Sequence, residues 1–114
     1  MRQEQSSDLQ ALRSWTFITN HAQILLAVAR DPAATVAELA AAVAITERSA
    51  YRILADLQHA GYVRRLKRGR QNVYEINPNM PLRDPTIENE CVRDLVNLLA
   101  EPDFEGHGRS QRVA

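Results

Sequence analysis

Apolar residues recur every three or four positions in the first half of the chain. In the stretch from Trp15 to Arg30 they share one helix face, at Trp15, Ile18, Ala22, Leu25, Leu26 and Ala29. Asp31-Pro32 ends this helix, because proline disfavours helical backbone in the residue before it. A second helix is predicted to begin at Val36, since Thr35 and Glu38 have the spacing of a capping box.

A third helix is predicted over residues 47–60. Thr46 is a favoured N-cap, and Gly61 suits the left-handed position that often follows a helix. The inward-facing positions of this helix are Ala50, Ile53, Leu54 and Leu57. Ala44 stands in the preceding turn, where glycine is common. A positive φ there costs an alanine roughly 1 kcal/mol, unless the turn has another shape.

After Gly61 the pattern changes to two strand-like runs, 62–67 and 72–76. The glycine between them predicts a hairpin over 63–76 with Gly69 at its tip. A linker with two prolines follows, and Asp84-Pro85 has the arrangement that opens a helix. This last helix is predicted to end at Glu101-Pro102, and its apolar residues are Ile87, Cys91, Val92, Leu95, Val96, Leu98 and Leu99.

The order helix, helix, turn, helix, hairpin, helix predicts a mainly α fold with a small β-hairpin wing, a winged helix-turn-helix. We divide the chain into four parts. They are an N-terminal arm or short helix (1–14), a winged helix-turn-helix DNA-binding domain (15–77), a linker with a C-terminal dimerisation helix (78–101), and a disordered tail (102–114).

The formal net charge is zero, which by itself argues against a nucleic-acid partner. The distribution of charge changes this picture. Residues 64–70 include no acid and carry Arg64, Arg65, Lys67, Arg68 and Arg70. Residues 84–105 hold seven acids against one arginine, so we expect a basic end and an acidic end. Such polarity orients a protein on a polyanion.

The predicted third helix exposes a stripe opposite its apolar face. Arg48 and Arg52 lie one turn apart on this stripe, where arginine can bond guanine or a phosphate in the major groove. Ser49 and Tyr51 flank them and can donate to phosphates, whereas Thr46 serves better as a cap. The predicted DNA-binding set is Thr46, Arg48, Ser49, Tyr51, Arg52, Arg64, Arg65, Lys67, Arg68 and Arg70. The alternatives are a solvated helix face and a hairpin edge protected by charge.

Composition and short motifs bear on whether the chain is a membrane protein, a secreted protein, a metalloprotein or an enzyme. No run reaches the ~18–20 apolar residues of a membrane span. The polar N-terminus and the single cysteine, Cys91, lead us to expect a cytoplasmic protein. Cys91, His21, His59 and His107 lack metal-ligand spacing, so we expect no metal and no cofactor. Cys91 is expected to be a core thiol, with a redox sensor as the alternative. We expect no enzyme, because nucleotide-binding loops and nucleophile motifs are absent from the sequence.

The stretch 45–63, ITERSAYRILADLQHAGYV, resembles the recognition helix and wing start of bacterial MarR-, IclR- and ArsR-type winged-helix regulators. Residues 35–44 are similar to the helix before it, and the resemblance extends over roughly 15–99. It implies dimeric DNA binding and usually repression, with DNA contacts at Ser49, Tyr51, Arg52 and the wing arginines. The chain departs from these families in two respects. We expect no room for the large effector domain of IclR-type regulators, and 36–44 lacks the cysteine pair of metal-sensing ArsR members.

The apolar stripe of the last helix is wide for so small a domain. We expect part of it to pack on the 15–30 helix and the rest to meet a symmetry mate, through Ile87, Cys91, Leu95, Leu98 and Leu99. The alternative is that this helix closes a monomeric core. For the whole chain, the alternative to double-stranded DNA binding is a winged-helix protein–protein module, and an RNA-binding winged helix is third.

Overall fold

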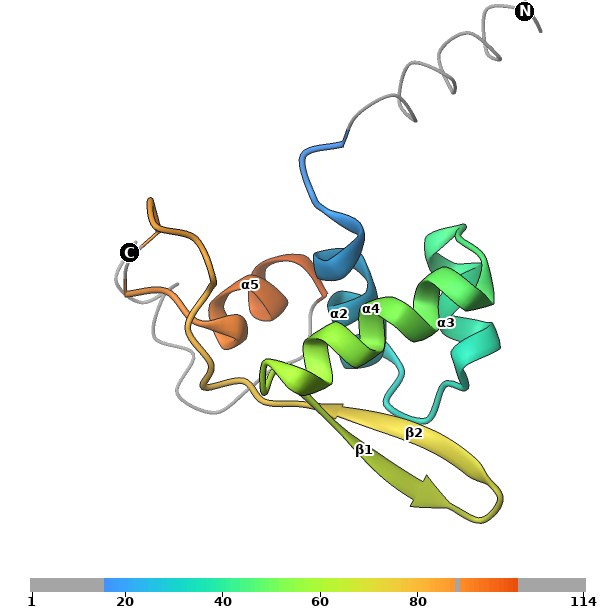
Figure 1. The fold of residues 1–114 in the computed structure, drawn as a ribbon. Helices are drawn as coiled ribbons and strands as arrows, with labels where there is room; N and C mark the ends of the chain where they lie inside the picture. The colour runs from blue at the N-terminus through green and yellow to red at the C-terminus, as the bar shows by residue number, and fades with distance from the viewer. Residues whose placement is uncertain (1–15, 88, 101–114) are drawn as a thin grey trace, which may run out of the picture.

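The computed structural model describes residues 16–87 and 89–100, and it forms a winged helix-turn-helix, as predicted. Its elements are α2 (Asn20–Arg30), α3 (Val36–Val43), α4 (Glu47–His59), β1 (Val63–Arg68), β2 (Gln71–Ile76) and α5 (Val92–Leu99). In Figure 1, α4 crosses α2, with α3 and α5 towards its two ends and the hairpin below. The predicted arm (1–14) and tail (102–114) lie outside the described residues. Within the described part, no helix is long and apolar enough to cross a membrane.

Local side-chain caps set where three helices begin. The Thr35 hydroxyl accepts from the Glu38 N–H at 3.2 Å, and the Glu38 carboxylate accepts from the Thr35 N–H at 2.8 Å, which confirms the capping box. Thr46 caps α4 by accepting from the Ser49 N–H at 3.0 Å. The first predicted helix begins later than expected, because Thr19 has extended backbone and caps α2, and residues 17–18 form a bend.

The turn between α3 and α4 uses a left-handed alanine. Ala44 has φ 65° and ψ 45°, so the costly conformation that the sequence left open is the one adopted. The Ile45 N–H donates to the Ala40 carbonyl at 3.0 Å and closes this turn. Gly61 takes a positive φ of 89° after α4, as predicted, and α4 itself ends at His59 with Ala60 as its C-cap.

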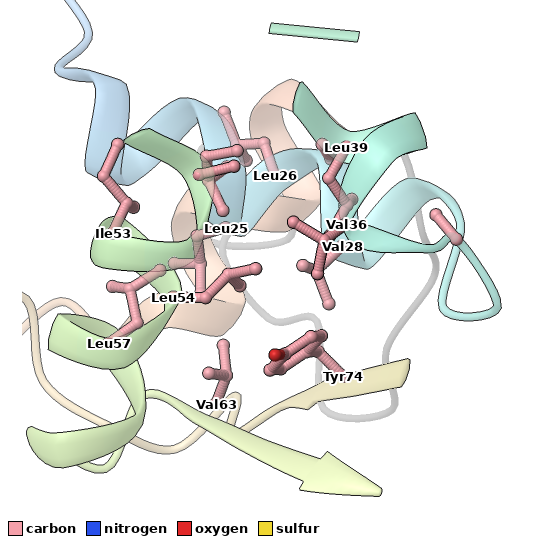
Figure 2. Close-up of a cluster of buried hydrophobic side chains, with 14 of the residues drawn as sticks. Leu25, Leu26, Val28, Val36, Leu39, Ile53, Leu54, Leu57, Val63 and Tyr74 are labelled. Carbon is pink, nitrogen blue, oxygen red and sulfur yellow. The ribbon is translucent and has the colours of Figure 1, made fainter. Parts of the chain in front are cut away.

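The core lies between the helices and the base of the hairpin. Figure 2 shows Leu25 of α2 beside Leu54 of α4 and Leu26 on the side of Leu39 of α3, with Val63 and Tyr74 closing the cluster below. All four inward positions predicted for α4 are buried, at Ala50, Ile53, Leu54 and Leu57. Ala40 and Ala50 are 2% and 0% exposed, and their small side chains let α3 and α4 approach closely.

The wing is an antiparallel hairpin whose register pairs Val63 with Ile76 and Arg68 with Gln71. The strands reach one residue nearer the tip than predicted, which leaves a two-residue turn. Gly69, the first turn residue, has φ 66°, a conformation that glycine adopts at little cost. Beyond Val63, every residue of β1 is exposed.

The prediction of a last helix opening at Asp84-Pro85 is wrong. The Asp84 carboxylate accepts from the Thr86 N–H at 2.9 Å and forms a turn instead. The chain then folds back, since the Leu82 N–H donates to the Glu90 carbonyl and the Val92 N–H donates to the Met80 carbonyl. The helix starts only at Val92, with Cys91 as its N-cap, so Ile87 lies in a loop and not on the helix.

Candidate nucleic-acid interface

The exposed face of α4 carries two of the predicted arginines. Arg48 and Arg52 are exposed one turn apart, on the side opposite the buried Ile53 and Leu54. Together with Ser49 they line a surface hollow of about 230 Å³. Tyr51, next to them, is 53% exposed. The first half of α4 therefore presents two guanidinium groups and a phenol to solvent.

Thr46 and Ser49 form a small hydrogen-bonded unit at the start of α4. The Thr46 hydroxyl accepts from the Ser49 N–H and donates to the Ser49 hydroxyl oxygen at 3.0 Å. Thr46 is thus used by the fold, as the sequence indicated. The Ser49 hydroxyl keeps its own proton, which it can donate to a phosphate.

The hairpin register sorts the basic wing residues onto two faces. Residues that pair across the strands share a face, so Arg65 and Lys67 lie on the face that also holds Val63 and Tyr74. This face is the one that packs towards the helices, since Val63 and Tyr74 belong to the core. Arg65 and Lys67 therefore lie on the same side of the hairpin as α4.

Arg64 lies on the opposite face of the hairpin. Its guanidinium pairs with the Glu75 carboxylate across the strands, and both side chains are more than half exposed. This pairing makes Arg64 a weaker candidate for a DNA contact than its neighbours. Within the described residues no salt bridge engages Arg48, Arg52, Arg65, Lys67, Arg68 or Arg70.

Tyr74 is a buried phenol on β2. Burial raises the pKa of its phenol above the ordinary value, and the positive charge of Arg65 acts in the opposite direction. Tyr51 of α4 also raises the pKa of Tyr74, a smaller effect. Arg65, on the basic face of the wing, thus lies directly across the strands from the buried Tyr74.

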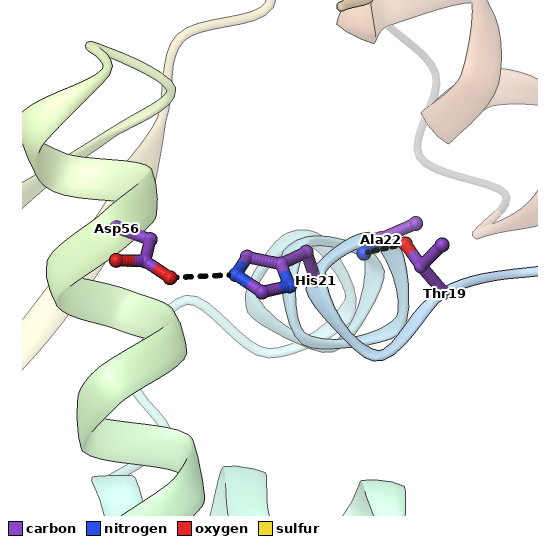
Figure 3. Close-up of polar contacts among 4 residues, drawn as sticks. All are labelled: Thr19, His21, Ala22 and Asp56. Atoms are coloured by element: carbon purple, nitrogen blue, oxygen red, sulfur yellow. Dashed lines mark hydrogen bonds and ion pairs between the residues drawn. The ribbon is translucent and has the colours of Figure 1, made fainter.

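A contact that the sequence did not predict joins α2 to α4. In Figure 3 the His21 imidazole points to the Asp56 carboxylate, with 2.8 Å between His21 Nε2 and Asp56 Oδ2. The two residues are 35 positions apart, and each side chain is about half exposed. No local pattern signals such a pair. In the part of the chain described, no group of three or more histidines, cysteines or acids could hold a metal ion.

The five residues predicted at a dimer interface differ in exposure. Leu98 is 71% exposed, and Leu99 and Ile87 are 38% and 40% exposed. Cys91 and Leu95 are partly buried within the chain, where Leu95 packs against the core. Of these five residues, the exposed ones therefore lie at the end of α5 and in the loop before it.

Helix-turn-helix, basic hairpin and exposed arginines together define a DNA-binding winged helix-turn-helix domain. The family model of the IclR helix-turn-helix domain matches residues 18–67, from the residue before the Thr19 cap into β1. Of the three regulator types that the sequence resembles, this match is to the IclR type, and it supports a DNA-binding transcription regulator. A search of curated proteins found no match.

Proposed function

We propose that this protein is a sequence-specific double-stranded DNA-binding transcription repressor that acts as a homodimer. One observation carries the proposal. Arg48 and Arg52 on α4, and Arg65 and Lys67 on the α4-facing side of the wing, lie on one side of the molecule, and among the described residues none of them is in a salt bridge. A solvated helix face does not require this alignment, and neither does a charge-protected hairpin edge.

In the proposed complex the first half of α4 enters the major groove. Arg48 and Arg52, one turn apart, then face base edges, and either guanidinium can bond guanine O6 and N7 together. The Ser49 hydroxyl and the Tyr51 phenol flank them, within reach of the phosphates that border the groove. Base selection rests on the arginines, and positioning rests on the hydroxyl groups.

The wing supplies the contacts that do not depend on the base sequence of the DNA. Arg68 and Arg70 stand on either side of Gly69 at the tip, where long cationic side chains can reach a phosphate or the minor groove. Arg65 and Lys67 follow along the α4-facing side. Each phosphate neutralised by such a cation adds about 0.9 to the salt dependence of binding.

For the dimer we propose that Leu98 and Leu99, with Ile87 beside the helix, meet their symmetry mates. A two-fold axis there places the two α4 helices on successive major grooves, about 34 Å apart. Light scattering should give a dimer, and Leu98→Glu should give a monomer. Leu66→Glu is the matched control, because it changes a leucine of the wing that is 36% exposed. A wild-type monomer at micromolar concentration refutes the dimer.

DNA binding is tested by titrating random duplexes and duplexes selected from a random pool, at about 50 and about 200 mM salt. Arg52→Ala should weaken a selected site about tenfold and random duplexes little. Arg68→Ala should weaken both alike and lower the salt slope by about 0.9. The control replaces Arg64 and Glu75 together by alanine, which removes an ion pair without changing net charge. No binding at low salt refutes the proposal and favours a protein–protein module.

Repression is proposed because occupancy of a promoter by a compact dimer is sufficient to exclude polymerase. Transcription in vitro from a promoter that contains a selected site tests this part separately. Added protein should lower the transcript yield, and Arg52→Ala should restore it. An increased yield would identify an activator instead.

A further inference from the structure

A hollow of about 470 Å³ opens at the far end of α4 from Arg48 and Arg52. Its walls come from the first turns of α2, the last two turns of α4, the segment that follows the wing, and α5. Small-molecule sites in proteins span about 300–1,000 Å³, so this hollow has the size for an organic ligand. It lies outside the surface proposed for DNA.

The floor of the hollow is apolar. Leu25 of α2 and Leu57 of α4 are 4% and 8% exposed and form part of the core. Leu82 and Leu95 pack against the same core and line the hollow from the other side. A floor built on packed core residues holds its shape, and it favours a ligand with a flat apolar body.

The rim of the hollow is polar and its charge is uneven. The carboxylate of Asp56 is already engaged by His21 Nε2 at 2.8 Å, as Figure 3 shows. Thr19, His59, Tyr62 and Arg83 also line the hollow, and Arg83 is exposed. Among residues 16–87 and 89–100, nothing forms a hydrogen bond or ion pair with the Arg83 guanidinium. In the described part of the chain, the rim thus holds one acid paired with His21 and one arginine without a partner.

We propose that this hollow binds a small organic anion, with an aromatic body on the leucine floor and a carboxylate on Arg83. The planar guanidinium fork matches a carboxylate with two parallel hydrogen bonds. Since α4 provides one wall, occupancy is coupled to DNA affinity. That consequence rests on the proposed function, whereas ligand binding itself does not.

The site is tested on the full chain without DNA, by calorimetry and by NMR shift mapping. The probe is 2-naphthoate, and 2-naphthamide is its uncharged control. We expect 2-naphthoate to bind saturably with one molecule per chain and to shift Ala22, Leu25 and Leu82. Arg83→Gln should weaken 2-naphthoate about tenfold and leave 2-naphthamide unchanged. Arg68→Gln, which removes a wing charge, should change neither.

A second variant fills the hollow. Ala22 lines it from α2 and is only partly buried, so Ala22→Phe should fold and abolish binding of both probes. Ala37→Phe, at an exposed position of α3, is the control and should leave both affinities unchanged. The site is refuted if 2-naphthoate does not saturate, if the shifts fall on the wing arginines, or if folded Ala22→Phe binds as the wild type does.

The coupling to DNA is measured separately with a selected duplex. Saturating 2-naphthoate should change the Kd for the duplex at least about threefold, and the duplex should change the 2-naphthoate Kd by the same factor. An unchanged Kd refutes the coupling. A chain that binds 2-naphthoate but no duplex refutes the proposed function and leaves the ligand site intact.

Discussion

Replacing Ala44 by glycine should stabilise the fold, because this alanine is held in the left-handed region. Ala44 has φ 65° and ψ 45° and is exposed, so the substitution removes no buried methyl group. Relief of the left-handed strain is worth about 1–2 kcal/mol. The greater freedom of glycine in the unfolded chain offsets about 0.5–1 kcal/mol of this. The expected net gain in the free energy of unfolding is about 0.5–1 kcal/mol.

The matched control is Ala41→Gly, three residues earlier. Ala41 is also exposed, but it lies within α3 with helical backbone, where glycine costs about 1 kcal/mol relative to alanine. Urea unfolding followed by far-UV circular dichroism measures both variants, with an unchanged m-value as the requirement for comparison. The two glycine substitutions should have opposite signs. Equal destabilisation by both would refute the left-handed turn.

Other predictions concern single residues. The wild-type chain should lose stability at alkaline pH, and Tyr74→Phe should abolish this loss. Because burial raises the pKa of the folded phenol, its stabilising contribution is full below the unfolded pKa of about 10 and is lost as pH rises through the folded pKa. Leu54→Ala, at a site 1% exposed, should lower the free energy of urea unfolding by about 2–5 kcal/mol. Thr46→Ala should cost about 1 kcal/mol through the lost α4 cap. Glu75→Gln, in an exposed pair with Arg64, should cost less than about 1 kcal/mol.

Prediction from sequence succeeded for α3 and α4 because their signals are local. The Thr35 and Glu38 pair and the Thr46 cap act over three residues, and the structure confirms both. It failed for the start of the last helix. Asp84-Pro85 has good opening chemistry, but the pairing of 80–82 with 90–92 holds the intervening chain in a loop. A non-local backbone pairing outweighed a local preference.

Some features of the candidate interface could likewise be predicted from sequence, and one could not. The exposure of Arg48 and Arg52 follows from helix periodicity alone, and the structure has it as expected. The different placement of Arg64 and Arg65 could not be predicted, because a one-residue change of hairpin register exchanges the two faces. The observed register pairs Arg64 with Glu75 and aligns Arg65 with Tyr74.

By itself, the sequence determined the order of elements, the helix caps, the inward face of α4 and the basic character of the wing. Each of these features depends on residues that are close in sequence, so it can be predicted without knowing the tertiary contacts. The tertiary structure alone decided the left-handed Ala44, the His21–Asp56 contact and the hollow beside Arg83. The left-handed turn at Ala44 depends on how α3 packs against α4. The other two features depend on how α2, α4 and the segment after the wing pack, which brings together residues that no sequence spacing relates.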